Sequence, residues 1–209
     1  MTVRIMIADD HAMVRDGLKL ILEAEDDLAV VGMAEDGRDA IVRAATLRPD
    51  IIVMDIAMPQ MNGIEATGTI RRSVPEARVI ILSMHQTREH IHRAMQAGAQ
   101  GYILKESAGT EVVKAVRAVM KGHRYFGNGL DLPTETPSLK SPLDSLSRRE
   151  REVLQLVVEG KTSAEIAEAL SLSPKSVETY RSRLMLKLGI TNIPSLVKFA
   201  LQHGITPAN

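Results

Sequence analysis

The chain lacks cysteine and tryptophan and has few other aromatic residues, and each absence excludes a class of structure. Without cysteine there is no disulfide and no thiolate metal ligand, which fits a reducing compartment. Aromatic residues make up 2% of the 209 residues and hydrophobic residues 44%, so the core must be aliphatic. No apolar run approaches the roughly 20 residues of a membrane-spanning helix, and the N-terminus becomes acidic too early for a secretory signal. We therefore expect a soluble, cytoplasmic protein that makes no membrane contact.

Short apolar runs alternate with amphipathic segments over residues 1–122. The runs predict five strands, at residues 3–8, 28–34, 51–55, 77–83 and 101–104. The segments that follow them predict helices, which end at glycine or before proline. Such an alternation is typical of α/β domains with a doubly wound parallel sheet, here five-stranded and flavodoxin-like. In these sheets the ligand site lies beyond the carboxyl ends of the strands.

The composition changes twice after this domain. Residues 123–143 contain three prolines and two glycines, which predicts a linker. From residue 144 to residue 209 only the helical period remains. Helix starts are marked by two capping-box patterns and by one serine followed by proline, at Ser147–Glu150, Thr162–Glu165 and Ser173–Pro174. We therefore expect residues 144–209 to form a small all-α domain of four helices.

Polar side chains stand at the ends of four predicted strands. They are Asp9 and Asp10 after the first, Asp55 at the end of the third, Ser83 at the end of the fourth and Lys105 after the fifth. Three carboxylates at one sheet edge require a cation, and oxygen ligands favour Mg²⁺. A metal, a free carboxylate, an ammonium and a hydroxyl together fit phosphoryl transfer. Helix capping explains any one of these residues, but it explains the whole set poorly.

This part of the chain resembles the receiver domain of bacterial two-component response regulators. The segments that carry the resemblance are IADDH, VMDIAMPQMNG, ILSMH and AGAQGYILKES. The resemblance implies that Asp55 is the phosphoacceptor. It also implies that Asp9 and Asp10 bind Mg²⁺ together with Asp55 and the backbone carbonyl of Ala57.

The resemblance extends to the residues that respond to the phosphoryl group. Ser83 is implied to hydrogen-bond it, Lys105 to pair with it, and Tyr102 to be an aromatic switch residue that repacks inward. From the sequence alone, Tyr102 can equally be an ordinary half-buried strand tyrosine. Many receivers have proline after the lysine, whereas this chain has Glu106, which leaves open whether the Lys105–Glu106 bond is cis.

A second set of motifs lies in the helical segment, in LSRREREVLQLVVEGKTSAEIA and SVETYRSRLMLKLGI. Residues 174–187 contain four basic side chains and one acidic one. The apolar side chains of this predicted helix share one face, at Val177, Tyr180, Leu184 and Leu188. A basic amphipathic helix that follows a short helix and a tight turn suits the major groove of DNA. An ordinary solvated surface helix remains the alternative from charge alone.

Residues 144–206 resemble the LuxR-type helix-turn-helix, and the whole chain resembles the NarL/FixJ family of response regulators. The resemblance implies that residues 174–188 are the recognition helix. Base edges would be met by Glu178, Thr179 and Ser182, and phosphates by Lys175, Arg181, Arg183 and Lys187. A carboxylate is unfavourable beside a polyanion, so Glu178 would accept from a cytosine amine or pair with a nearby arginine.

The function that follows is a phosphorylation switch. A sensor histidine kinase or a small phosphodonor would phosphorylate Asp55, and the chain would then form a homodimer on an inverted repeat in double-stranded DNA. No turnover of an external substrate is expected, so the protein is not an enzyme. Two alternatives remain: a regulator that binds DNA without phosphorylation, and a phosphatase with an aspartyl-phosphate intermediate. Against the phosphatase, Ala57 stands two residues after Asp55, where a general acid would be needed.

Overall fold

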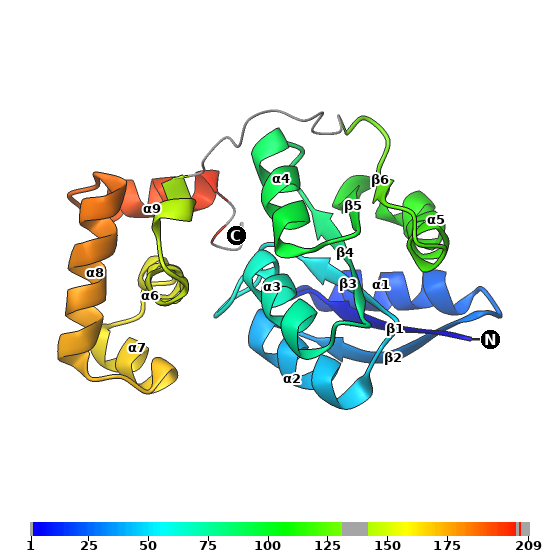
Figure 1. Cartoon of the computed structure of the whole chain (residues 1–209), viewed down its shortest axis with the longest axis horizontal. Helices are drawn as coiled ribbons and strands as arrows, with labels where there is room; N and C mark the ends of the chain where they lie inside the picture. Colours follow the sequence, from blue (N-terminus) through cyan, green and yellow to red (C-terminus); the bar gives the residue numbers. More distant parts are fainter. Residues whose placement is uncertain (1, 131–141, 204, 206–209) are drawn as a thin grey trace. The chain divides into compact units, whose positions relative to one another are not determined.

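The computed structural model describes residues 2–130, 142–203 and 205, and the chain divides into two compact units, Met1–Glu135 and Thr136–Asn209. The first unit is built on a parallel sheet with the strand order β2-β1-β3-β4-β5-β6 (Figure 1). Its strands are β1 (Val3–Ala8), β2 (Leu28–Ala34), β3 (Ile51–Asp55), β4 (Arg78–Ser83), β5 (Gly101–Leu104) and β6 (Tyr125–Phe126). Its helices are α1 (Ala12–Glu23), α2 (Gly37–Leu47), α3 (Gly63–Ser73), α4 (Arg88–Ala97) and α5 (Ala108–Met120), with a 3₁₀ turn η1 (Lys105–Ser107).

Helices cover both faces of the sheet (Figure 1). The side chains of α1 and α5 pack into one core with Ile5, Ile7 and Val53, and those of α2, α3 and α4 pack into the other with Met6 and Met54. Because alternate residues of a strand point to opposite faces, a strand covered on both sides must be apolar throughout. Every residue of β3 is accordingly buried. The predicted doubly wound parallel architecture is confirmed.

The sheet has one strand more than the five that the sequence predicts. The sixth strand, β6, falls within the segment that composition assigned to the linker, and it pairs parallel to β5 through Gly101–Tyr125 and Tyr102–Phe126. A two-residue strand is too short to produce a period-two pattern, which is why the prediction missed it. Residues 131–141 of the expected linker lie outside the described residues.

The second unit is helical and has its own aliphatic core. It contains a 3₁₀ turn η2 (Pro142–Ser145) and the helices α6 (Arg148–Val158), α7 (Ser163–Leu170), α8 (Pro174–Leu188) and α9 (Ile193–Gln202). Both predicted capping boxes form, with Glu150 and Glu165 accepting from the backbone N–H groups of Ser147 and Thr162. No single helix of the described ranges is long and apolar enough to cross a membrane, although α8 and α9, bent by 67°, pass that test of length and composition when taken together.

Candidate functional site

Four strands of the first unit deliver polar side chains to one edge of the sheet. Asp9 follows β1, Asp55 ends β3, Ser83 ends β4 and Lys105 follows β5, and three of these side chains meet directly. The Lys105 Nζ atom lies 2.8 Å from Asp9 Oδ2 and 2.8 Å from Asp55 Oδ2. The structure therefore brings together two carboxylates and an ammonium that the sequence placed at separate strand ends.

Burial gives Asp55 unusual properties for a carboxylate. Loss of solvent raises its pKa to about 6, repulsion from Asp9 adds to the rise, and attraction to Lys105 opposes it. Lys105 is affected in the other direction. Burial lowers the pKa of its ammonium, but the carboxylates of Asp55 and Asp9 outweigh that effect and raise the pKa above its usual value. The lysine thus remains a cation in direct contact with the carboxylate that is expected to react.

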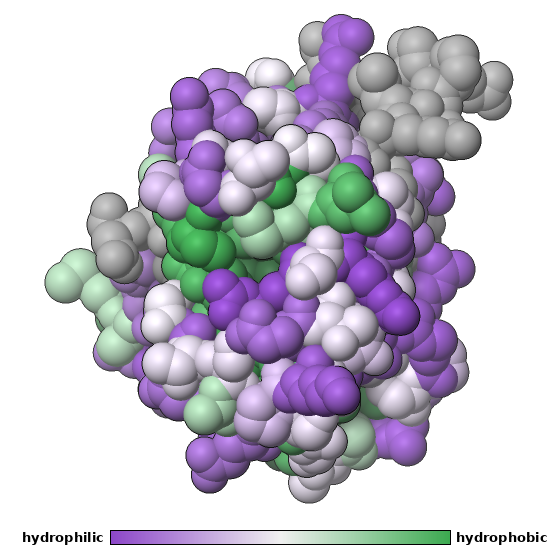
Figure 2. All heavy atoms as spheres, turned by 90° about the vertical axis from the view of Figure 1, so that its left-hand side faces the viewer, coloured by the Kyte–Doolittle hydropathy of each residue, from purple (hydrophilic) through white to green (hydrophobic). Residues whose placement is uncertain are grey.

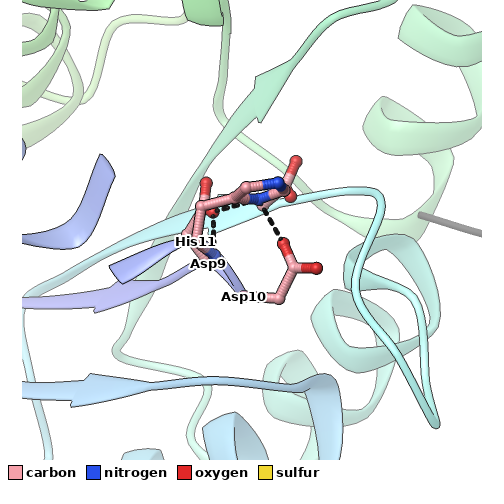
Figure 3. Close-up of side chains that lie close together, drawn as sticks. Asp9, Asp10 and His11 are labelled. Carbon is pink, nitrogen blue, oxygen red and sulfur yellow. Dashed lines mark hydrogen bonds and ion pairs between the residues drawn. The ribbon is translucent and has the colours of Figure 1, made fainter. Parts of the chain in front are cut away.

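The acidic pair continues into a histidine that the sequence motifs did not single out. In Figure 3, the His11 ring turns toward both neighbouring carboxylates. Its Nδ1 lies 2.7 Å from Asp10 Oδ1 and 3.3 Å from Asp9 Oδ1, and the His11 N–H donates to Asp9 Oδ1 at 2.9 Å. Ligand atoms of Asp9, Asp10, His11 and Asp55 lie within 4.8 Å of one another. Only its position directly after the two acids could have pointed to this histidine.

This donor set fits a hard divalent cation. Three of the four groups are carboxylates, the ligands that Mg²⁺ prefers, and Asp10 keeps part of its side chain exposed, so water can complete the coordination. The backbone of Ala57 lies beside the cluster, where it hydrogen-bonds to the Asp55 carboxylate. Coordination by the Ala57 carbonyl stays a prediction.

Ser83 and Tyr102 both hydrogen-bond to the backbone of His85. The Ser83 hydroxyl accepts from the His85 N–H at 2.9 Å, and the Tyr102 hydroxyl donates to the His85 carbonyl at 2.7 Å. The Tyr102 side chain is fully buried, and this burial raises its pKa to about 12. The tyrosine is thus fully buried rather than half-buried, and its role as a switch residue stays a prediction. No peptide bond between described residues is cis, so the Lys105–Glu106 bond is trans.

The loop after β3 holds Asp55 in place through a close backbone contact. The Gly63 N–H donates to the Ile56 carbonyl at 2.9 Å, which draws the start of α3 against the end of β3. A Cβ at Gly63 would lie 1.8 Å from the Asp55 carbonyl oxygen, so only glycine permits this approach. The Asn62 side chain caps α3 by accepting from the Glu65 N–H at 3.0 Å.

In the second unit, α8 presents the side chains that were predicted to meet DNA. Its apolar residues Val177 and Leu184 are buried, and Tyr180 and Leu188 pack partly against the same core. The exposed side chains of this helix include Lys175, Glu178, Thr179, Ser182, Arg183 and Lys187, and Arg181 is partly exposed. Figure 2 shows one face of the molecule, on which hydrophilic side chains cover most of the surface and hydrophobic ones gather in a patch.

Two of the four predicted phosphate contacts already have partners in the protein. The Lys187 Nζ lies 2.7 Å from Oε2 of the buried Glu150 in α6. Arg181 Nη1 lies 3.1 Å from Glu178 Oε1 and donates to Ser163 Oγ at 3.0 Å. Any contact of these cations with DNA must therefore compete with, or add to, an existing interaction.

Known proteins match both units of the chain. Residues 5–117 match the model of the response regulator receiver domain, and residues 144–200 match that of bacterial regulatory proteins of the luxR family. The transcriptional regulatory protein MctR of Rhizobium johnstonii is 39% identical over 97% of this chain and 95% of its own length. The response regulator UvrY of Escherichia coli is 37% identical over 99% of this chain and 97% of its own.

A solved structure extends the similarity to a DNA complex. The response regulator RcsB bound to DNA is 30% identical, with a TM-score of 0.57 over 97% of this chain and 99% of that one. Family models and full-length relatives thus match both units, in the same order along the chain. The chain belongs to the two-component response regulators that join a receiver domain to a LuxR-type DNA-binding domain.

Proposed function

We propose that Asp55 accepts a phosphoryl group from a sensor histidine kinase or a small phosphodonor, and that this modification controls dimerisation and DNA binding. The observation that carries the proposal is the contact of Lys105 Nζ with both Asp9 and Asp55, 2.8 Å from each, at the edge of a parallel sheet. An ammonium fixed beside a buried carboxylate can bind the phosphoryl oxygens that approach that carboxylate.

The transfer is a displacement at phosphorus. One Asp55 oxygen forms a bond to phosphorus while the bond from phosphorus to the donor nitrogen breaks, and the donor histidine keeps the electron pair and takes up a proton. Lys105 neutralises charge on the phosphoryl oxygens, and the Ser83 hydroxyl donates to one of them. Asp9, Asp10, Asp55 and the Ala57 carbonyl would hold Mg²⁺, which supplies positive charge to the same oxygens.

The signal passes from the site along β5. Ser83 and Tyr102 share the backbone of His85 as a hydrogen-bond partner, so movement of the serine toward a phosphoryl group alters the surroundings of the tyrosine ring. Tyr102 also pairs with Phe126 of β6, the last strand before the segment that leads to the DNA-binding unit. Phosphorylation would therefore change the surface around α4, β5 and α5.

DNA binding is assigned to α8 as the recognition helix. Lys175 and Arg183 are exposed and lie outside the ion pairs described above, which suits contact with phosphates. Thr179 and Ser182 are exposed beside them, where they can reach base edges. Two copies on an inverted repeat would double the phosphate contacts.

The first test is intact mass after incubation with a small phosphodonor, with and without Mg²⁺, for wild type, Asp55→Asn and Asp16→Asn. We expect wild type and Asp16→Asn to gain one phosphoryl group only with Mg²⁺, and Asp55→Asn to gain none. Asp16 is an exposed acid of the same domain, so it controls for a change of charge.

No gain by folded wild type would contradict the proposal and favour a regulator that binds DNA without phosphorylation. Sustained hydrolysis of a phosphate ester by wild type, lost in Asp55→Asn, would instead favour the phosphatase.

A further inference from the structure

Three side chains join the two helices of the helix-turn-helix, and of these Glu178 is exposed while Ser163 and Arg181 are partly exposed. Ser163 is the first residue of α7, and Glu178 and Arg181 lie one turn apart on α8. The Ser163 hydroxyl donates to Glu178 Oε1, and Arg181 Nη1 donates to Ser163 Oγ at 3.0 Å and to Glu178 Oε1 at 3.1 Å. Each of the three thus contacts the other two, and we call them the α7–α8 clamp.

The clamp restricts a side chain that would otherwise be mobile. A glutamate on an exposed helix loses rotamer freedom when it binds a ligand, and this loss weakens binding. Here Glu178 Oε1 is already fixed by two donors from two helices, although 58% of the side chain is exposed. The second oxygen, Oε2, has no hydrogen-bond partner among the described residues, so it is available to accept a hydrogen bond from outside the protein.

The clamp also reduces the electrostatic cost of placing a carboxylate on a DNA-binding surface. The guanidinium of Arg181 compensates the charge of Glu178 locally, which reduces repulsion by nearby phosphates. The hydrogen bond from Ser163, followed by the attraction of Arg181, holds the pKa of Glu178 below its ordinary value. The group is therefore an ionised acceptor with no donor capacity at neutral pH.

On this basis, and resting on the proposed function, we infer that Glu178 reads an exocyclic amino group in the major groove and that Ser163 and Arg181 are positioning residues for that contact. The chemical target is the amino group of cytosine or adenine, the donors that those bases present there. Arg181 acts mainly through Glu178, in contrast to the phosphate contact that its charge alone suggested.

Arg183 provides a matched contrast on the same helix. It is exposed and makes no ion pair within the described part of the chain, so a phosphate contact is its expected role. Loss of a phosphate contact weakens binding to all sequences alike. It also lowers the steepness with which log affinity falls against log salt concentration by about 1. Loss of a positioning residue instead relaxes the preference at one base pair.

The test is selection of binding sites by the full chain from a library of random double-stranded DNA, with and without prior treatment with phosphodonor and Mg²⁺. Affinities are then measured for the selected site and for its three substitutions at each position. The variants are Glu178→Gln, Ser163→Ala, Arg181→Ala and Arg183→Ala. Ser195→Ala, an exposed serine at the start of α9, is the control for loss of a hydroxyl.

We expect Glu178→Gln, Ser163→Ala and Arg181→Ala to lose about 10-fold in discrimination at the same base pair, the size of one good base contact. Arg183→Ala should weaken binding uniformly, and Ser195→Ala should leave the profile unchanged. Ser163→Thr keeps the hydroxyl and should restore the preference. Thermal melts check that each variant is folded.

If folded Ser163→Ala and Arg181→Ala keep the wild-type discrimination at every base pair, the positioning role of these residues is overturned, while the proposed function stays intact. Uniform weakening by Arg181→Ala, matching that of Arg183→Ala, would overturn the positioning role in the same way. If wild type enriches no sequence under either condition, the proposed function fails, and the inference fails with it.

Discussion

Asp55 is held in an environment that opposes its charge, and this opposition is a cost that folding must offset. The carboxylate is 1% exposed, and burial together with Asp9 raises its pKa from 3.8 to about 6. A tenfold change in an acid dissociation constant corresponds to about 1.4 kcal/mol, so the ionised group destabilises the receiver by about 3 kcal/mol. The buried carboxylate therefore lowers the stability of the receiver, and a bound cation would offset this cost.

Replacement of Asp55 by asparagine should stabilise the receiver in metal-free buffer. Because the folded chain holds its proton up to a higher pH than the unfolded chain, this group lowers the free energy of unfolding as pH rises from about 4 to about 6. The variant lacks that titration. The free energy of unfolding of the variant should therefore exceed that of wild type by an amount that grows across this pH window, up to about 3 kcal/mol.

Urea unfolding at pH 4, 5, 6 and 7, followed by the NMR signals of β3, measures the difference. Asp16→Asn is the exposed control and should show no such trend. A constant difference between Asp55→Asn and wild type across the window would contradict the burial argument.

At the scale of elements, the join between β3 and α3 depends on one glycine. Gly63→Ala should destabilise the receiver by about 1–3 kcal/mol, the usual cost of overpacking, because its Cβ would clash with the Asp55 carbonyl. Gly17→Ala is the matched control, since Gly17 lies within α1 and a Cβ there would meet no atom within 4 Å. It should stabilise by about 0.5–1 kcal/mol. Chemical unfolding measures the free energy of unfolding of both variants. Equal changes in the two would refute the steric explanation.

The elements show how far the sequence alone predicts this molecule. Strands 51–55 and 101–104 were predicted at their observed bounds, because short continuous apolar runs are strong local signals. β6 was missed because a pair of residues carries no period, and its strand character comes only from pairing with β5. His11 and the Ser163 contacts were missed for a related reason: they depend on the placement of side chains, which no spacing rule encodes.

The chain after β6 is anchored by a buried acid on α5. Glu111 is 1% exposed, its Oε2 accepts from the Ser107 hydroxyl at 2.9 Å, and its Oε1 accepts from the Asn128 N–H at 2.9 Å. Glu111→Ala removes both acceptors and should raise the amide exchange rates of Asn128 and of Gly127, whose N–H donates to the Tyr102 carbonyl. Glu106→Ala, an exposed acid before α5, should change neither rate. Hydrogen exchange measured by NMR distinguishes the two, and unchanged protection in Glu111→Ala would show that β6 alone holds this segment.

At the scale of the whole molecule, the candidate phosphoacceptor and the candidate recognition helix lie in separate units of one chain, and we expect phosphorylation to control DNA binding through assembly. If phosphorylation brings two DNA-binding units onto an inverted repeat, the number of neutralised phosphates doubles, and the slope of log affinity against log salt should double with it. The measurement compares phosphodonor-treated full chain on the selected inverted repeat with the same DNA carrying one scrambled half-site.

Treated Asp55→Asn provides the control, and it should keep the shallow slope on both DNAs. Equal slopes for treated wild type on the two DNAs would mean that one unit binds at a time. Phosphorylation would then act on exposure of α8 within a single chain, because a change in assembly necessarily changes the count of phosphate contacts.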